Sequence, residues 1–321
     1  MGRNKPVNVI GLTSPVTSLT AGSSHTCGLT VTGAVKCWGK NSDGQLGDGG
    51  STDRRTPVNV SGLTSGVTSV SAGSSHTCAV TPTGGVRCWG KNSDGQLGDG
   101  GTTDRRAPVD VTGLASGVIS VAAGASHTCA VTTTDGVRCW GKNSDGQLGD
   151  GTTTDRRTPV QVSGISSGIT LLVAESSHTC GLTEAGGVKC WGDNPEGQLG
   201  DGTQTARRIP VDVIGLTSSV TALAVGSSHG CAITTAGGVQ CWGNNSNGQL
   251  GIGTTFGRRS PVDVTGLSSG VTAVAAGSNH TCALTTDGGA LCWGQNSLRQ
   301  IGDGTLTDRR VPTEVVGFST D

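Results

Sequence analysis

Short runs of small and β-branched apolar residues alternate with turn residues along the whole chain. In residues 67–117 these runs predict four strands, joined between the second and third by a Pro-Thr-Gly hairpin tip. The expected strands cover 67–72, 76–81, 85–89 and 108–111. No segment has the period of an amphipathic helix. The pattern therefore predicts an all-β chain.

The four-strand pattern recurs with a constant period of 51 residues, without insertion or deletion, as the cysteine before each Trp-Gly shows. We expect six repeats in one domain over residues 1–321. Their core motifs cover about 16–66, 67–117, 118–168, 169–219, 220–270 and 271–318. The Pro-Val-x-Val segment of the last strand occurs once more than the rest of the motif, which predicts a spare outer strand at 6–12.

Repeats of four short strands indicate a β-propeller, because blades stacked around an axis protect one another's strand edges. We expect an all-β β-propeller of six four-stranded blades, with an incomplete seven-bladed ring as the alternative. The spare strand would close the ring from one terminus or pair with a second molecule. The corresponding assemblies are a monomer and a strand-exchanged dimer.

The repeat also resembles a known family. His-Thr-Cys-Ala-Val-Thr, then Val-Arg-Cys-Trp-Gly-x-Asn-Ser-x-Gly-Gln-Leu-Gly-Asp-Gly, then Pro-Val-x-Val follow in the order of the RCC1 (regulator of chromosome condensation) repeat over almost the whole chain. The resemblance implies a β-propeller, usually of seven blades, that generally acts as an interaction platform. It also implies, as an alternative, a guanine-nucleotide exchange factor or a chromatin-binding protein.

Cysteine occurs only in pairs ten residues apart, one pair in each repeat. If the second and third strands are antiparallel, the two cysteines lie opposite each other at a Cα separation of about 4.5 Å, which suits a disulfide. The pairs are Cys27 and Cys37, Cys78 and Cys88, Cys129 and Cys139, Cys180 and Cys190, Cys231 and Cys241, and Cys282 and Cys292. Six disulfides would indicate an oxidising compartment. RCC1-like repeats with this pair resemble those of secreted bacterial proteins.

Two other interpretations of the cysteines stay open. They could be small buried apolar residues. They could also bind a metal, because His25 and Cys27 point to one face of a strand and Cys37 can join them. The same set returns in each repeat up to His280, Cys282 and Cys292. A fourth metal ligand that recurs in every repeat is missing. We therefore expect no bound metal, and we also expect no cofactor.

The other repeated side chains favour structural roles. One histidine per repeat is expected to make hydrogen bonds at blade junctions, because no repeat offers a distinct acid or nucleophile beside it. The tryptophan after each second cysteine, for example Trp38, is expected to point away from that cysteine into the next blade and to form core. These tryptophans are Trp38, Trp89, Trp140, Trp191, Trp242 and Trp293.

Composition narrows the function. The net charge is -1, and Tyr is absent from the 321 residues, which makes nucleic acid an unlikely ligand. No apolar stretch is long enough to span a bilayer. The first residues, MGRNKPVNV, contain no apolar signal-peptide segment, so either the protein is cytosolic or this sequence is a mature chain. The cysteine pairs favour the second alternative and an extracellular or cell-surface protein.

Strand alternation places the long loop between the third and fourth strands on one face with the first turn, and the hairpin tips on the other face. Each long loop ends in an Arg pair, which we interpret as an annulus that could bind carboxylates, sulfated glycans or phosphates. Alternatively, one Arg of each pair bonds loop carbonyls or the preceding Asp, such as Asp53. The annulus comprises Arg54, Arg55, Arg105, Arg106, Arg156, Arg157, Arg207, Arg208, Arg258, Arg259, Arg309, Arg310 and the nearby Phe256.

The same loop carries spaced oxygen donors such as Asp43 and Asp48 that hint at calcium. The spacing is not that of an EF-hand, and Asp48 becomes Ile252 in the fifth repeat. We therefore expect a non-enzymatic extracellular scaffold that binds an unknown protein or an anionic glycan. The near-identity of the repeats also fits a recently amplified or engineered protein whose role is structural.

Overall fold

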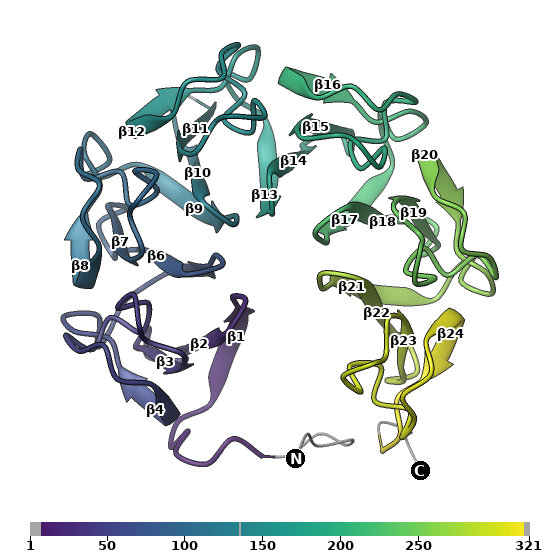
Figure 1. The fold of residues 1–321 in the computed structure, drawn as a ribbon, viewed down its shortest axis with the longest axis horizontal. Coiled ribbons are helices and arrows are strands. Elements are labelled where there is room, and N and C mark those ends of the chain that lie inside the picture. Colours follow the sequence, from purple (N-terminus) through teal and green to yellow (C-terminus); the bar gives the residue numbers. More distant parts are fainter. Residues whose placement is uncertain (1–7, 135, 318–321) are drawn as a thin grey trace. The chain divides into compact units, whose positions relative to one another are not determined.

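The computed structural model describes residues 8–134 and 136–317, and its regular elements are 24 strands in six four-stranded sheets. Each sheet has its strands in chain order, so consecutive strands are hydrogen-bonded neighbours. We call the sheets blades 1 to 6. The prediction of an all-β propeller with six four-stranded blades is confirmed (Figure 1).

The strands have the following bounds. The first strands are β1 (Val16–Ala21), β5 (Ser69–Ala72), β9 (Val118–Ala123), β13 (Ile169–Glu175), β17 (Val220–Val225) and β21 (Val271–Ala276). The second strands are β2 (His25–Thr30), β6 (His76–Val80), β10 (His127–Thr132), β14 (His178–Thr183), β18 (His229–Thr234) and β22 (His280–Thr285). The third strands are β3 (Val35–Gly39), β7 (Val86–Gly90), β11 (Gly136–Gly141), β15 (Val188–Gly192), β19 (Val239–Gly243) and β23 (Ala290–Gly294). The fourth strands are β4 (Arg54–Asn59), β8 (Arg105–Asp110), β12 (Arg156–Gln161), β16 (Arg207–Asp212), β20 (Arg258–Asp263) and β24 (Arg309–Glu314).

The chain forms two compact units, and the boundary between them falls within blade 4. One unit holds Val9–Thr179 with Arg207–Pro210, and the other holds Cys180–Ala206 with the chain from Val211 onward. In the unit with blades 1 to 3, β1 and β9 lie on the inner side and β4, β8 and β12 on the outer side (Figure 1). In the unit with blades 5 and 6, β17 and β21 are inner and β20 and β24 outer (Figure 1).

Two expected strand boundaries are wrong. The fourth strand starts at the Arg pair, for example at Arg105, and not at Pro108. Arg105 pairs with Gly90, and the register shifts before the next pair, Cys88 and Val109. This irregularity accommodates the proline inside an outer strand, where a missing N–H is tolerated. Residues 8–12 hold a turn rather than strand, and the rest of the expected spare strand at 6–12 lies outside the described residues.

The cores of blades 1, 2 and 5 are each completed by a tryptophan from the blade that follows. Trp89 of β7 packs with Cys27, Cys37 and Leu46 of blade 1, and Trp140 packs in the same way on blade 2. The tryptophan thus faces the preceding blade, and the expectation that it faces the next one is wrong. Alternation along a strand sets Trp and Cys on opposite faces, but it does not show which neighbour each face meets. Trp89 is fully buried, whereas Trp38 of blade 1 is half-buried.

Candidate binding surface

All twelve cysteines form disulfides within their own blades, as the sequence predicted. Cys129 lies directly opposite Cys139 in the register of β10 and β11, with a Cα separation of 4.0 Å. Both side chains are fully buried. Because a disulfide sulfur is no thiolate ligand, the alternative metal set of His25, Cys27 and Cys37 is not formed.

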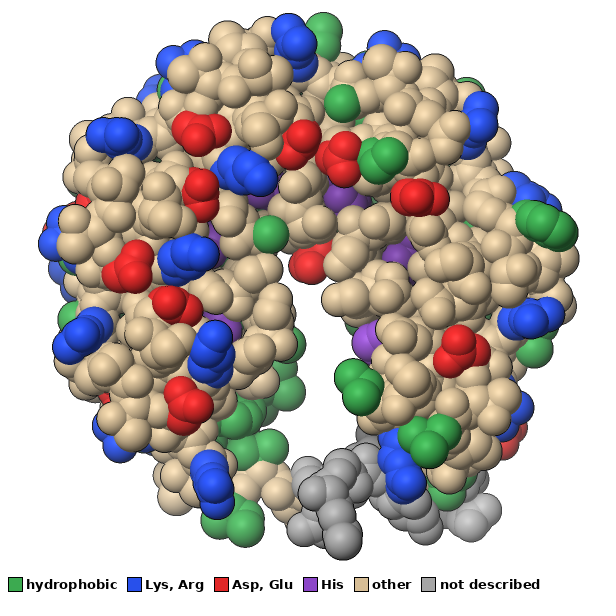
Figure 2. Space-filling model, in the orientation of Figure 1, with side chains coloured by type: hydrophobic (Ala, Val, Ile, Leu, Met, Phe, Trp, Pro, Cys, Tyr) green, Lys and Arg blue, Asp and Glu red, His purple; other side chains and the backbone are tan. Residues whose placement is uncertain are grey.

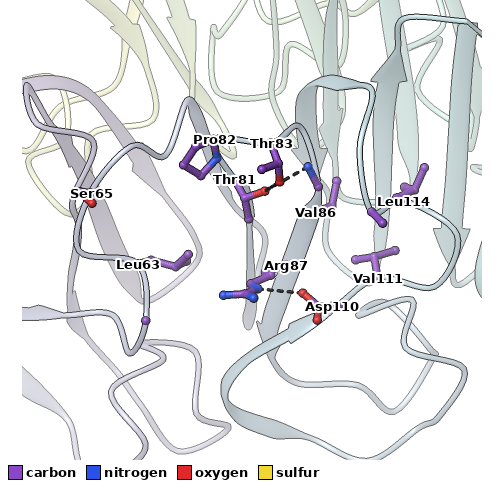
Figure 3. Close-up of a pocket in the computed structure, with 13 residues that line it drawn as sticks. Leu63, Ser65, Thr81, Pro82, Thr83, Val86, Arg87, Asp110, Val111 and Leu114 are labelled. Carbon is purple, nitrogen blue, oxygen red and sulfur yellow. Dashed lines mark hydrogen bonds and ion pairs between the residues drawn. The ribbon is translucent and has the colours of Figure 1, made fainter.

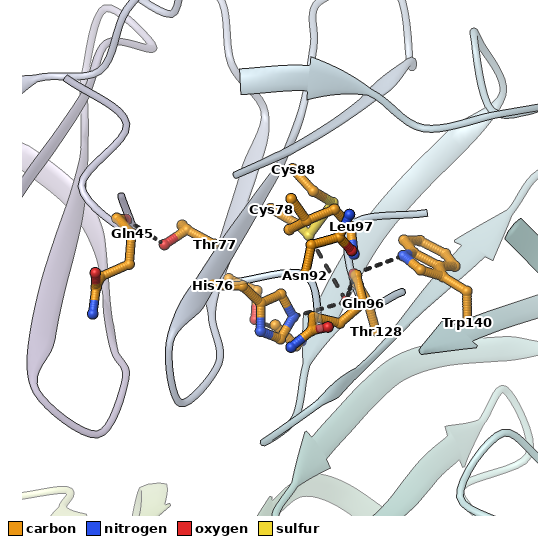
Figure 4. Close-up of a disulfide and its surroundings, with 12 residues drawn as sticks. Gln45, His76, Thr77, Cys78, Cys88, Asn92, Gln96, Leu97, Thr128 and Trp140 are labelled. Atoms are coloured by element: carbon orange, nitrogen blue, oxygen red, sulfur yellow. Dashed lines mark hydrogen bonds between the residues drawn. A yellow bond between two sulfur atoms is a disulfide. The ribbon is translucent and has the colours of Figure 1, made fainter. Parts of the chain in front are cut away.

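A hydrogen-bonded chain joins blade 2 to blade 3 (Figure 4). The Gln96 main-chain carbonyl accepts hydrogen bonds from Thr128 Oγ1 at 2.9 Å and Trp140 Nε1 at 2.9 Å. His76 Nε2 lies 2.8 Å from the same Thr128 Oγ1. We call this set the blade latch. It recurs between blades 1 and 2 through His25, Thr77, Gln45 and Trp89. It is not formed between blades 4 and 5, where Gly230 replaces the threonine and His178 Nε2 has no hydrogen-bond partner among the described residues.

The latch histidines are held neutral. Burial lowers the pKa of His76 to about 3 and that of His25 to about 4. A base that works near neutral pH needs a pKa near that pH, and these rings are buried with their Nε2 atoms committed to the neighbouring blade. His25, His76, His127 and His229 therefore have a structural role in joining blades.

The long loop between the third and fourth strands is organised around a buried asparagine. Asn41 Oδ1 accepts from the Leu46 N–H at 3.0 Å, and Asn41 Nδ2 donates to Asp48 Oδ1 at 3.0 Å. The Asn41 N–H donates to Asp53 Oδ1 at 2.8 Å. The same contacts hold the loop of blade 2 around Asn92. These bonds fix the loop on its blade.

The first Arg of each pair has a carboxylate partner in several blades, but not the one expected. Arg54 Nε and Nη2 lie 2.8 and 2.7 Å from Asp48 Oδ2, whereas Asp53 accepts from the loop backbone. Equivalent ion pairs join Arg105 to Asp99, Arg156 to Asp150 and Arg309 to Asp303. Burial alone would raise the pKa of Asp48, but hydrogen bonds from Gly50, Arg54 and Asn41 outweigh it and lower that pKa. With both oxygens occupied, Asp48 is not arranged as a calcium ligand.

The second Arg of each pair is exposed. In blades 2 to 6 its main-chain carbonyl accepts a hydrogen bond from the preceding blade; the Gly49 N–H, for example, donates to Arg106 O at 2.9 Å. Its backbone also packs against Gly44, where an added Cβ would lie 2.7 Å from Arg106 Cα. The guanidinium stays at the surface. The exposed set is Arg55, Arg106, Arg157, Arg208, Arg259 and Arg310.

Hydrogen bonds confirm the expected sorting of the loops between two faces. Lys40 N–H donates to Ser24 O, which joins the long loop to the first turn. Gly66 N–H donates to Thr32 O, which joins a hairpin tip to the link between blades. On this second face, a pocket between blades 1 and 2 is lined by the Thr81–Thr83 tip, Leu63 and the ion pair of Arg87 with Asp110 at 2.8 Å (Figure 3).

Sequence reasoning missed one acidic position that breaks the repeat. The first strands of the other blades lead into a glycine such as Gly73. The Gly73 N–H donates to His76 O at 2.9 Å, and a Cβ added to Gly73 would lie 2.5 Å from the His76 ring. Blade 4 has Glu175 there, followed by Ser176 in the left-handed region at φ 44°. Burial raises the pKa of Glu175. The signal was present in the printed sequence as Ala-Glu-Ser-Ser-His among five Gly-containing repeats.

In the part of the chain that the structure describes, no helix could span a membrane. Groups of three or more His, Cys, Asp or Glu side chains placed to hold a metal are also absent from the described residues.

The chain is similar to several characterised proteins. It is 34% identical over 303 residues to the ultraviolet-B receptor UVR8 of Arabidopsis thaliana, covering 92% of this chain and 69% of that protein. It is 31% identical over 322 residues to the human E3 ubiquitin-protein ligase HERC2, of which it spans 7%. Among solved structures, human WBSCR16 superposes with a TM-score of 0.84 at 24% identity, covering 97% and 84% of the two chains.

Yeast RCC1 (Prp20), solved in a complex with Kap60, superposes with a TM-score of 0.81 at 22% identity, covering 95% and 76% of the two chains. At these identities the structural matches show the fold alone. The RCC1-like domain model matches residues 2–320. The chain therefore belongs to the RCC1-like domain family.

Proposed function

We propose that this protein is a non-enzymatic, extracellular binding platform that presents its long-loop face to an anionic partner. The proposal rests on the different environments of the two arginines in each pair. The first Arg is half-buried and, in blade 3 for example, is paired with Asp150. The second, Arg157, is exposed, and its main-chain carbonyl accepts the Gly100 N–H of blade 2 at 3.0 Å. The fourth strand of every blade thus presents one exposed guanidinium group. Such a group suits carboxylates or sulfates, which Arg binds in a bidentate manner.

Extracellular placement is supported by the six buried disulfides. Structural disulfides persist in oxidising compartments, whereas cytosolic thiol systems keep cysteines reduced. Each bridge crosses from the second to the third strand. The bridges of blades 2 and 5 also contact the blade latch, since Cys78 Sγ and Cys231 Sγ each lie 3.9 Å from the latch threonine of the next blade. We therefore place the protein outside the reducing cytosol.

A non-enzymatic role is supported by the use of the repeated polar side chains. Histidines such as His76 take part in blade latches, and the loop asparagines and aspartates bond one another and the loop backbone. Platforms of this kind are what the family resemblance implies. The partner is an acidic protein surface or an anionic glycan.

The proposal is tested by measuring the binding of soluble polyanions, poly-glutamate and a heparin fragment, to matched Arg variants of the full chain. The double substitution Arg106→Gln with Arg157→Gln removes two exposed guanidinium groups. We expect weaker polyanion binding and an unchanged urea midpoint. The control Arg105→Gln breaks the pair with Asp99 and is expected to lower the midpoint with little effect on binding.

Equal binding by the wild type and the double variant would contradict the role of the exposed Arg set. Absence of binding to either polyanion at low salt would contradict the platform function. Extracellular placement has a separate test, thiol alkylation of the protein in the cells that produce it. We expect no alkylated cysteine before reduction, and full alkylation would refute this placement.

A further inference from the structure

The long loops of blades 5 and 6 depart from the others in charge. From the residue after Trp-Gly to the second Arg, the loops of blades 1, 2 and 3 each carry three basic and three acidic side chains. The loop at 244–259 in blade 5 carries only its two arginines, and that at 295–310 in blade 6 has three arginines against two aspartates. Acidic side chains are interspersed with basic ones over β1–β12 in Figure 2 and are sparse over β17–β24. The loops of blades 5 and 6 are therefore locally cationic.

Blade 5 also lacks the carboxylate that holds the first Arg elsewhere. Ile252 stands where blade 3 has Asp150, and Gly257 stands where it has Asp155. Among the residues that the structure describes, Arg258 has no carboxylate partner, and its Nη1 donates only to the carbonyls of Phe256 and Gly257, at 3.3 and 3.2 Å. A half-buried guanidinium with carbonyl partners alone can still bind a carboxylate.

The long loops of blades 5 and 6 also carry exposed apolar side chains. Phe256 is 73% exposed, Leu306 is 55% exposed and Leu298 is 82% exposed. Leu306 lines a groove between the loops of blades 5 and 6 together with Thr255, the neighbour of Phe256, and with Arg310. Large apolar side chains beside arginines are typical anchors of protein interfaces.

An equivalent groove in the same chain serves as an internal reference. Between blades 2 and 3, a groove is lined by Asp94, Thr153, Asp155 and Arg157. In the groove of blades 5 and 6, Asn247 replaces Asp94 and Leu306 replaces Thr153, while Asp308 and Arg310 keep their places. The comparison isolates two changes, the loss of one negative charge and the gain of one apolar side chain.

We propose that the groove between blades 5 and 6, together with Phe256 and Arg258, which follow its lining residue Thr255 in the chain, is a docking site for an acidic peptide segment that carries aromatic or aliphatic residues. The inference rests on the proposed function, because it names the partner class of one part of the same loop face. A carboxylate of the peptide pairs with Arg258, where the other blades use their own aspartate. Its apolar residues cover Phe256 and Leu306, which is why a peptide fits this groove better than a glycan does.

The experiment measures fluorescence anisotropy of a labelled peptide of alternating Glu with Phe or Leu against the intact, oxidised protein. In the variant Ile252→Asp, the chain itself supplies the missing carboxylate to Arg258. We expect affinity to fall about tenfold, the equivalent of one desolvated ion pair. The urea midpoint should stay the same or rise, which separates lost binding from misfolding.

Two further variants complete the test. Phe256→Thr restores the residue of blade 3 and should also weaken binding about tenfold without changing stability, because the ring is exposed. Thr154→Ala changes the equivalent position of blade 3 and should leave binding unchanged.

Equal affinity of the wild type, Ile252→Asp and Phe256→Thr for the peptide would overturn the site. So would equal binding of a peptide with Lys in place of Glu. If the heparin fragment binds through the exposed Arg set and the peptide does not bind at all, the docking site is refuted and the platform function stands. If neither ligand binds, both are refuted.

Discussion

His76 Nε2 lies 2.8 Å from Thr128 Oγ1 of the following blade, and the same hydroxyl lies 2.9 Å from the Gln96 carbonyl. Because the carbonyl can only accept, the single hydroxyl proton of Thr128 goes to Gln96. The hydroxyl oxygen must then accept the hydrogen of His76 Nε2, which fixes the tautomer of the ring. A side chain of blade 3 thus joins two groups of blade 2 at one buried point.

Removal of this hydroxyl should weaken the contact between blades. Thr128→Val preserves the shape of the side chain but leaves the Nε2–H of His76 buried without an acceptor. The expected loss is about 1–3 kcal/mol in the free energy of unfolding, the usual cost of a buried unsatisfied donor. Urea denaturation measures it. Thr128→Ser keeps the hydroxyl and should lose clearly less, so equal losses for Val and Ser would argue against the latch.

The buried histidines of the blades should make the fold sensitive to mild acid. Burial lowers the pKa of His127 and His76 to about 3 and of His178 to about 4, from an unfolded value of 6.5. The unfolded chain therefore binds these protons at a higher pH than the folded protein does. The stabilisation is present above pH 6.5 and is lost as the pH falls toward 4 and below.

We expect the urea midpoint to decrease steadily between pH 6.5 and 4.5. In the folded protein, the imidazole NMR signals of these histidines should not titrate above pH 5. Imidazole signals that titrate near pH 6.5 with the fold intact would show that the rings are not held as described.

Glu175 should have the opposite effect on stability as pH changes. Burial raises the pKa of Glu175 above its ordinary value of 4.5, so its contribution is most favourable below that value and is lost as the pH rises through the folded-state pKa. Glu175→Gln should raise the urea midpoint at pH 7, and the difference should shrink near pH 4. Glu184→Gln, on an exposed hairpin tip, is the control and should leave the urea midpoint unchanged at both pH values. A lower midpoint for Glu175→Gln at pH 7 would mean that the carboxylate is stabilising.

Each disulfide should contribute measurably to stability. The double substitution Cys129→Ser with Cys139→Ser opens a short loop in blade 3 and buries two hydroxyls in a core that excludes solvent. We expect a loss of about 2–3 kcal/mol. Calorimetry of the oxidised double variant measures it, and the wild type in reductant should show a larger decrease. An unchanged melting temperature would show that this bridge has no role in stability.

Most of the blade could be predicted from the sequence because the 51-residue period has no insertion, so one reading of a repeat applies to all six. The pairing of Cys27 with Cys37 followed from the hairpin alone. The partner of Arg54 did not, because Asp53 is adjacent in sequence while Asp48 reaches Arg54 only through a loop that turns at glycines with positive φ, such as Gly47 and Gly49.

Strand periodicity does not show which blade the tryptophans face, or that Arg258 has no carboxylate partner among the described residues. Both depend on how blades and loops pack. The exception at Arg258 was nevertheless visible as Ile252 in a column of aspartates. Glu175 was visible in the same way. In a chain this regular, departures from the repeat are the best sequence signal for functional or strained positions.

A disulfide closes the central hairpin of each blade, and on this we base the proposal that the protein functions in an oxidising compartment. Peptide mapping by mass spectrometry, on protein denatured and digested without reduction, tests it most directly. We predict six linked peptides, each joining the two cysteines of one repeat, and no free thiol. Free cysteines throughout, or bridges between different repeats, would contradict the claim.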